Sequence, residues 1–423
     1  MHLTLVGGEL IDGGVRRTGE RLVLREGRIV AVGPDVPSCG VVVDVSDLLI
    51  LPGFLDLHTH GGGGFALHTT EPEEILAYAR WVTRTGTTAF LVNVVGVPDD
   101  LPERQLTAAA LAITHPDRSG AEPLGIYLEG PFLNPARRGA HHASWLRSPD
   151  LSLAERLLAA ARGHLRVVTL APELPGALDI LDRFIAAGVL VAIGHTEAPY
   201  EQARVAFAHG ARLLTHCFNA MPPLLHRAPG PLGALVEQES AFGELIADGH
   251  HVLPVVMRVL VHALGPGRTV VITDAQPGAG LPPGTTFSFA GCLARVDPDV
   301  ARLTDGTIAG SVLTMDQALR VLVESVGVPL EDAVLMLTTT PARAIGVDQR
   351  KGRLAPGYDA DLVLLDRKLR VQATFCRGRV AFARNDWLGR VDDPVAAALE
   401  EAALRPDLEC SSSEPEHDLG MRR

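Results

Sequence analysis

The chain has 423 residues, of which 47% are hydrophobic and 21% charged, and its formal net charge is −12. This length exceeds what one compact core usually holds, so we expect one large domain and a smaller one. The composition is that of an ordinary globular protein. The negative charge argues against a nucleic-acid partner or an anionic membrane surface.

The cysteines and the N-terminus bear on the cellular compartment. Five cysteines are scattered along the chain without a CxxC pair, which favours reduced thiols in a cytoplasmic protein. The N-terminus lacks a basic segment followed by an apolar one, and no apolar run reaches about 18 residues. We therefore predict a cytoplasmic protein with no export signal and no membrane span.

Both ends of the chain have a β-rich texture. Short alternating runs broken by glycine lie within residues 3–44 and return within 352–383, which indicates strands and hairpins. We predict that residues 1–50 and 351–392 together form one small β-sandwich domain. The tail, 393–423, is expected to be helical at first, at 395–404, and then disordered.

Between residues 51 and 350 strand-like and helix-like segments alternate. Eight short apolar runs are typical of parallel strands covered on both faces: 54–58, 88–93, 125–129, 166–171, 190–194, 212–216, 244–248 and 270–274. Helical patterns lie between several of them, at 73–83, 153–161, 177–187 and 200–209. Eight such units in roughly 250 residues predict an α/β fold, a (β/α)8 barrel.

Polar side chains follow most of these strands. His58 and His60 sit at the end of the first, where alternate residues share a face. The other polar strand ends are Glu129, His195, His216, Asp248 and Asp274. Because the carboxyl ends of barrel strands converge on one mouth, and imidazole and carboxylate are common metal ligands, the pattern predicts a metal pocket. Any single one of them could instead be a structural histidine or a solvated carboxylate.

The motifs that carry these residues resemble a known family. The HxH pair, Glu129-Gly-Pro-Phe132, Gly194-His-Thr196, Thr215-His-Cys-Phe-Asn-Ala-Met221 and Thr273-Asp-Ala275 are similar to the amidohydrolase superfamily. More narrowly, they resemble N-acetylglucosamine-6-phosphate deacetylases, and the resemblance spans nearly the whole chain. It implies a TIM barrel of the metal-dependent amidohydrolase type.

The positions of the lysines exclude one group of the amidohydrolase superfamily. Hydantoinase-like and dihydroorotase-like members bridge two metals with a modified lysine on strand four. The only lysines here are Lys351 and Lys368, both outside the predicted barrel, so that mechanism is not available. Glu129 is the carboxylate placed to act instead, as it is in the deacetylases.

The resemblance also implies roles at the metal site. Glu129, His195 and His216 would hold one divalent metal, and His58 and His60 would hold a second together with Glu129. We expect two ions rather than one, zinc first, with iron, cobalt or manganese as alternatives. Asp274 would be the general base and then the general acid, or alternatively a ligand or a strand-end cap. His141 would donate to the carbonyl oxygen on which charge develops.

The family pattern assigns substrate contacts to residues distributed over several loops. They are Ala140, His141, Asn219, Ala220, Arg227, His251, Ile308, Ala309 and Gly310. Arg227 is the natural partner of a phosphate, by charge and bidentate geometry, although a surface-loop arginine is the alternative. Relatives supply part of this phosphate contact from a neighbouring subunit, so we predict a homodimer.

The implied function is hydrolysis of the N-acetyl group of N-acetylglucosamine 6-phosphate, giving glucosamine 6-phosphate and acetate, in amino-sugar catabolism and cell-wall recycling. Two alternatives stay open. One is an amidohydrolase for another N-acyl substrate, such as N-acetylgalactosamine 6-phosphate, because residues 91–95, 222–227 and 276–280 depart from the pattern near the sugar. The other is an inactive scaffold homologue, against which the complete set of metal ligands argues.

Overall fold

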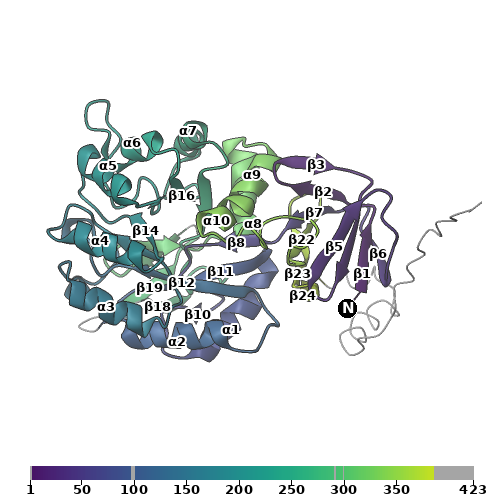
Figure 1. Ribbon diagram of the computed structural model, residues 1–423, viewed down its shortest axis with the longest axis horizontal. Helices are drawn as coiled ribbons and strands as arrows, with labels where there is room; N and C mark the ends of the chain where they lie inside the picture. The colour runs from purple at the N-terminus through teal and green to yellow at the C-terminus, as the bar shows by residue number, and fades with distance from the viewer. Residues whose placement is uncertain (1, 97–100, 290–291, 299, 385–423) are drawn as a thin grey trace, which may run out of the picture.

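The computed structural model describes residues 2–96, 101–289, 292–298 and 300–384. Its main feature is an eight-stranded sheet that forms a nearly closed barrel, in the order β8-β11-β12-β13-β14-β15-β16-β17. In Figure 1 the barrel and its helices fill the left of the view, and a smaller unit of strands lies to the right. The predicted (β/α)8 barrel with a small β domain is therefore confirmed.

All neighbouring strands of the barrel pair in parallel. The strands are β8 (Phe54–Asp56), β11 (Thr87–Val94), β12 (Glu122–Glu129), β13 (Leu165–Leu170), β14 (Leu190–Ile193), β15 (Leu213–Leu214), β16 (Phe242–Ile246) and β17 (Thr269–Ile272). Each falls on a predicted run, with ends shifted by up to a few residues. All eight residues of β11 are buried, as expected for a strand covered on both faces.

The first and last strands of the barrel are joined by individual bonds rather than a long ladder. The backbone N–H of Asp274 donates to the carbonyl of His58 at 2.8 Å. The Asp56 carboxylate also accepts from the hydroxyl and the backbone N–H of Thr273, at 2.6 and 3.2 Å. These bonds hold the ends of β8 and β17 side by side, which brings His58 and Asp274 to the same point of the mouth.

Helices follow the barrel strands and cover their outer faces (Figure 1). The seven that follow strands β8 to β16 are α1 (Pro72–Trp81), α2 (Glu103–Thr114), α3 (Leu151–Ala160), α4 (Ala177–Ala186), α5 (Tyr200–His209), α6 (Gly230–Glu237) and α7 (Pro254–Leu264). After β17 come α8 (Met315–Arg320), the π-helical η4 (Val321–Val326), α9 (Leu330–Leu337) and α10 (Thr339–Ala344). In α4 the buried residues are Ala177, Ile180, Leu181 and Phe184, the spacing of one helical face.

Short elements connect these helices to the strands. They are β9 (Gly61–Gly62), β10 (Phe65–Ala66) and the 3₁₀ turns η1 (Val82–Thr85), η2 (Pro135–Arg137) and η3 (Ala143–Trp145).

A four-stranded sheet is inserted after β17, which the sequence analysis did not anticipate. Its strands are β18 (Thr286–Phe289), β19 (Cys292–Val296), β20 (Val300–Leu303) and β21 (Ile308–Ser311). It packs on Val95 and Trp145 through Phe287, Ala294 and Val296. Backbone bonds between Ser311 and the residues after β17 then place β21 at the barrel mouth.

The small β domain has two sheets built from both chain ends. One contains β1 (His2–Val6), β4 (Arg21–Arg25), β5 (Arg28–Gly33) and β6 (Val41–Asp44). The other contains β2 (Glu9–Asp12), β3 (Val15–Arg17), β7 (Leu49–Pro52), β22 (Leu362–Leu365), β23 (Val371–Cys376) and β24 (Arg379–Ala383). Strand β7 pairs with β22, which joins the two ends of the chain. Buried Leu5, Leu24, Ile50, Leu364 and Phe375 form its core.

Two predictions concern regions outside this description. The helix at 395–404 and the disordered end of the chain lie outside the described residues. Among the residues that are described, no helix has the length and apolar character needed to cross a bilayer.

Candidate active site

Several strand ends turn sharply at the barrel mouth. His195, His216 and Asp274, which follow β14, β15 and β17, have φ values of 47°, 27° and 48°. Phe218 and Ala220 in the same region also have positive φ. Side-chain residues adopt this left-handed conformation at a cost of about 1–3 kcal/mol each, and such strain concentrates at functional sites. The turns direct the His and Asp side chains into one cavity.

The first cluster is centred on Glu129, at the end of β12. Its Oε1 lies 3.0 Å from His195 Nε2 and 3.3 Å from His216 Nε2, and its Oε2 lies 3.4 Å from His141 Nε2. The Nε2 atoms of His195 and His216 are 3.0 Å apart. His195 donates through Nδ1 to the carbonyl of Arg137 at 2.7 Å, so its Nε2 presents a lone pair to the cluster. Glu129, His141 and His195 form one group able to hold a metal ion.

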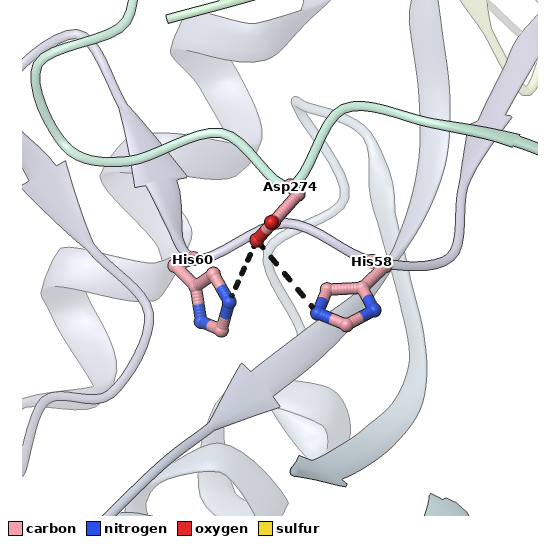
Figure 2. Close-up of side chains that lie close together, drawn as sticks. All are labelled: His58, His60 and Asp274. Carbon is pink, nitrogen blue, oxygen red and sulfur yellow. Dashed lines mark ion pairs between the residues drawn. The ribbon is translucent and has the colours of Figure 1, made fainter. Parts of the chain in front are cut away.

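The second cluster joins the ends of β8 and β17. His60 Nε2 lies 3.1 Å from Asp274 Oδ1, and His58 Nε2 lies 3.8 Å from the same atom. Figure 2 shows the imidazoles of His60 and His58 beside one another, both facing the Asp274 carboxylate. His58, His60 and Asp274 form a second group able to hold a metal ion. Glu129 bridges the clusters, with Oε1 3.6 Å from His58 Nε2 and Oε2 3.5 Å from His60 Nε2.

A buried layer supports these ligands from inside the barrel. Glu244 on β16, which the sequence analysis did not single out, accepts a hydrogen bond from His58 Nδ1 at 3.0 Å. Tyr127 on β12 packs against His58 with ring centroids 4.6 Å apart. The Tyr127 hydroxyl is itself held by the hydroxyls of Thr169 and Thr215, at 2.9 and 3.0 Å. The orientation of His58 is therefore fixed from two sides.

Burial and neighbouring charges shift the pKa values at the site. Burial opposes ionisation of Asp274, but the hydrogen bond from His60 and the charge of His58 lower the pKa of this carboxyl to about 2. Burial lowers the pKa of His141 to about 4, against the attraction of Glu129. Asp274 is therefore an ionised acceptor at neutral pH, and His141 is a neutral imidazole with one N–H to donate.

The side chains present fit a divalent metal. Glu129 and Glu244 are buried and Asp274 is mostly so, and the ion pairs observed for these carboxylates in the described part of the chain are with histidines. Buried carboxylates without Arg or Lys partners are costly unless cations compensate them. In addition, His58 Nε2 is buried and has no hydrogen-bond partner in the structure described. Ligand bonds of about 2.0–2.2 Å space tetrahedral ligand atoms about 3.4 Å apart, close to the separations found here.

A cavity of about 230 Å³ opens in front of both clusters. Most of the predicted site residues line it: His60, Glu129, Ala140, His141, His195, His216, Asn219, Ala220, His251, Asp274, Ile308, Ala309 and Gly310. His58 is brought to the same cluster but lies fully buried behind the lining. Gly139 and His250 also line the cavity and were not predicted, and Gln276, from the segment 276–280 expected near the sugar, lines it as well.

Two features of the lining bear on substrate binding. His251 is held by Asp248, and although burial opposes protonation, this hydrogen bond and charge raise the pKa of His251. A cationic imidazole at this position suits an anionic group. Gly310 has φ 75°, and a Cβ there would lie 2.4 Å from Gln276 Nε2 and 2.7 Å from the carbonyl of Asp274. Only glycine allows β21 to approach the mouth this closely.

Arg227 is not brought to the cavity of its own chain. It lies on an exposed loop between β15 and α6, next to the backbone pair formed by Leu225 and Ala228. Lys351 is also remote from the catalytic end of the barrel. Its Nζ lies 2.6 Å from the carboxylate of Glu122, at the start of β12, and 2.9 Å from that of Asp359.

The barrel mouth, with its two groups of metal-ligating side chains and an ionised carboxylate, defines a metal-dependent hydrolase of the TIM-barrel class. The model of the amidohydrolase family matches residues 49–381. The chain therefore belongs to the amidohydrolase family.

Relatives with more than 30% identity include deacetylases of two N-acetylhexosamine 6-phosphates. The chain is 37% identical to N-acetylgalactosamine-6-phosphate deacetylase of Escherichia coli O157:H7, covering 85% of this chain and 94% of that one. It is 34% identical to N-acetylglucosamine-6-phosphate deacetylase of Vibrio furnissii, covering 79% and 83%. Among solved structures, a mutant N-acetyl-D-glucosamine-6-phosphate deacetylase from Mycobacterium smegmatis, in complex with N-acetyl-D-glucosamine-6-phosphate, is 35% identical. It superposes with a TM-score of 0.84 over 90% of this chain and 100% of that one.

Proposed function

We propose that this protein is a metal-dependent deacetylase that hydrolyses N-acetylglucosamine 6-phosphate to glucosamine 6-phosphate and acetate. The observation that carries the proposal is the convergence of Glu129, Asp274 and the histidines that follow β8, β14 and β15 at one barrel mouth. The similarity to deacetylases of both N-acetylhexosamine 6-phosphates supports the same reaction. N-acetylgalactosamine 6-phosphate is the second candidate substrate, because a deacetylase of that sugar is 37% identical over most of both chains.

Glu129, His195 and His216 would hold one divalent ion, and His58 and His60 would hold a second with Glu129 and Asp274. Zinc is the ion that this mixture of imidazole and carboxylate ligands suits best, although iron, cobalt and manganese share these preferences. When bound, such ions act as Lewis acids that activate water and polarise an acyl oxygen.

The chain's own residues provide the proton transfers. The Asp274 carboxylate accepts a proton from the attacking water while the water oxygen bonds to the acyl carbon. As the C–N bond breaks, Asp274 returns that proton to the leaving nitrogen, since an unprotonated amine leaves poorly. His141, as a neutral imidazole, donates its N–H to the acyl oxygen on which negative charge develops. The products are acetate and the amine of the sugar.

The phosphate would be bound at the rim of the cavity by His251 and by Arg227. Because Arg227 lies outside the cavity of its own chain, the proposal assigns its contact to the cavity of a second subunit in a homodimer. Leu224 and Leu225 on the same loop are exposed and apolar, which is the kind of surface that a subunit contact covers. The remaining predicted contacts, from Ala140, Asn219, Ala220 and β21, would orient the sugar.

The substrate assignment is tested by acetate release from three compounds: N-acetylglucosamine 6-phosphate, its galacto epimer and unphosphorylated N-acetylglucosamine. The proposal expects the highest kcat/KM for the phosphorylated gluco sugar. A higher value for the galacto epimer would transfer the assignment to the second candidate. Turnover of neither phosphorylated sugar by metal-loaded protein would refute the proposed function.

A further inference from the structure

Glu244 makes an unusual pair of contacts in the barrel interior. It lies on β16, and its side chain is completely buried. Its Oε2 accepts from His58 Nδ1 at 3.0 Å and from the backbone N–H of His216 at 3.2 Å. One carboxylate oxygen therefore contacts a residue of each cluster. His58 is 186 positions and His216 is 28 positions from Glu244 in the sequence.

We propose that Glu244 is a positioning residue that sets the tautomer and orientation of His58. This inference rests on the metal dependence in the proposed function. Because an ionised carboxylate only accepts hydrogen bonds, the proton of His58 is placed on Nδ1. His58 Nε2 is then the ring nitrogen left for a metal ion, and it faces Glu129 and Asp274.

The two clusters differ in the acceptor that holds the Nδ1–H group of their histidines. The corresponding contact of His195 goes from Nδ1 to the main-chain carbonyl of Arg137, which is a neutral acceptor. A carboxylate acceptor makes an imidazole more basic and a stronger ligand, and loss of such a partner typically weakens metal binding 10–100-fold. We therefore expect Glu244 to matter most for the ion held by His58.

A purely structural role does not account for Glu244 equally well. A buried carboxylate is a poor way to fill a barrel interior, because its desolvation is costly and an apolar side chain of similar size usually does at least as well. In the described part of the chain, the side-chain partner of Glu244 is a histidine of the metal site. Tyr127 packs against the His58 ring, and Glu244 is the acceptor that decides which of its nitrogens carries the proton.

The test compares Glu244→Leu and Glu244→Gln with wild type, with Glu239→Leu, an exposed position just before β16, as the control. Ion stoichiometry and affinity are measured on the full-length protein by elemental analysis and by competition with a chromogenic zinc chelator, without substrate. Glu244→Leu should weaken the binding of one ion about 100-fold and leave the binding affinity for the other ion within threefold of wild type. Glu244→Gln should weaken the binding of that same ion about tenfold, because the amide oxygen still accepts from His58 Nδ1–H but lacks the full charge.

Wild-type affinity for every ion in both Glu244 variants would overturn the inference, as would equal weakening of all ions. If Glu244→Leu does not fold, Glu244→Gln decides by the same criterion. Because the assay contains no substrate, it is separate from the proposed reaction. Protein that binds ions as expected but releases no acetate would refute the deacetylase function and leave the role of Glu244 standing.

Discussion

Replacement of Asp274 by Asn tests the proposed proton transfers. The substitution keeps the volume of the side chain and keeps an oxygen that can accept from His60 Nε2, which lies 3.1 Å from Oδ1. It removes the negative charge, and with it the ability to take a proton from water. Loss of a positioned general base or acid typically costs 10²–10⁴-fold in rate, equivalent to about 3–5 kcal/mol of activation free energy.

The expected result is a kcat reduced by about 10²–10⁴-fold with KM within a few-fold of wild type, because Asp274 acts on the reacting atoms rather than on the bulk of the sugar. The assay is acetate release under saturating substrate, with metal content measured on the same samples to separate loss of the base from loss of a ligand. Asp305→Asn, an exposed carboxylate on the inserted sheet, is the matched control. A kcat within threefold of wild type in metal-replete Asp274→Asn would refute the proposed role.

Three further predictions concern the substrate and the fold. Arg227→Ala should raise KM at least tenfold for a phosphorylated sugar and leave unphosphorylated N-acetylglucosamine unaffected; equal effects on both would contradict the phosphate contact. Lys351→Met should lower the free energy of unfolding by about 3–5 kcal/mol in denaturant titrations, because it leaves the buried carboxylates of Asp359 and Asp361 and the half-buried one of Glu122 without this cation; a change below about 1 kcal/mol would contradict it. Burial opposes ionisation of Glu122, but its bond to Arg350 and the charge of Lys351 hold the pKa of that carboxyl below its ordinary value of 4.5. Its stabilisation is therefore complete above the unfolded-state pKa and should be lost as pH falls below about 4.5, more steeply in wild type than in Lys351→Met; identical acid unfolding profiles would contradict this.

Prediction from the sequence was most successful where a buried apolar strand ends in a side chain that can bind a metal or transfer a proton. Apolar strands that end in His, Glu or Asp allowed the barrel and most side chains of the two clusters at its mouth to be predicted, because parallel strands are buried on both faces and their carboxyl ends converge. The runs ending at Glu129 and Asp274 show this directly, since each carboxylate lines the cavity. The roles of these residues stay predictions until variants are measured.

The features that could not be predicted from the sequence depend on contacts between residues far apart in the chain. Glu244 lies inside a strand, and nothing local indicates that its carboxylate meets His58, which is 186 positions away. The inserted sheet from β18 to β21 is short-stranded and rich in turns, so its texture resembles that of a loop. His250, which lies on the loop between β16 and α7, lines the cavity although no local pattern in the sequence indicates it.

The most direct test of the central claim is acetate release from N-acetylglucosamine 6-phosphate by one preparation of the protein, as purified, after chelator treatment and after readdition of a divalent ion. We predict that activity is lost with the bound metal and returns with it, in proportion to the ion content measured on the same samples. Full activity in protein stripped of metal would contradict the account, as would metal-loaded protein that releases no acetate from either hexosamine phosphate.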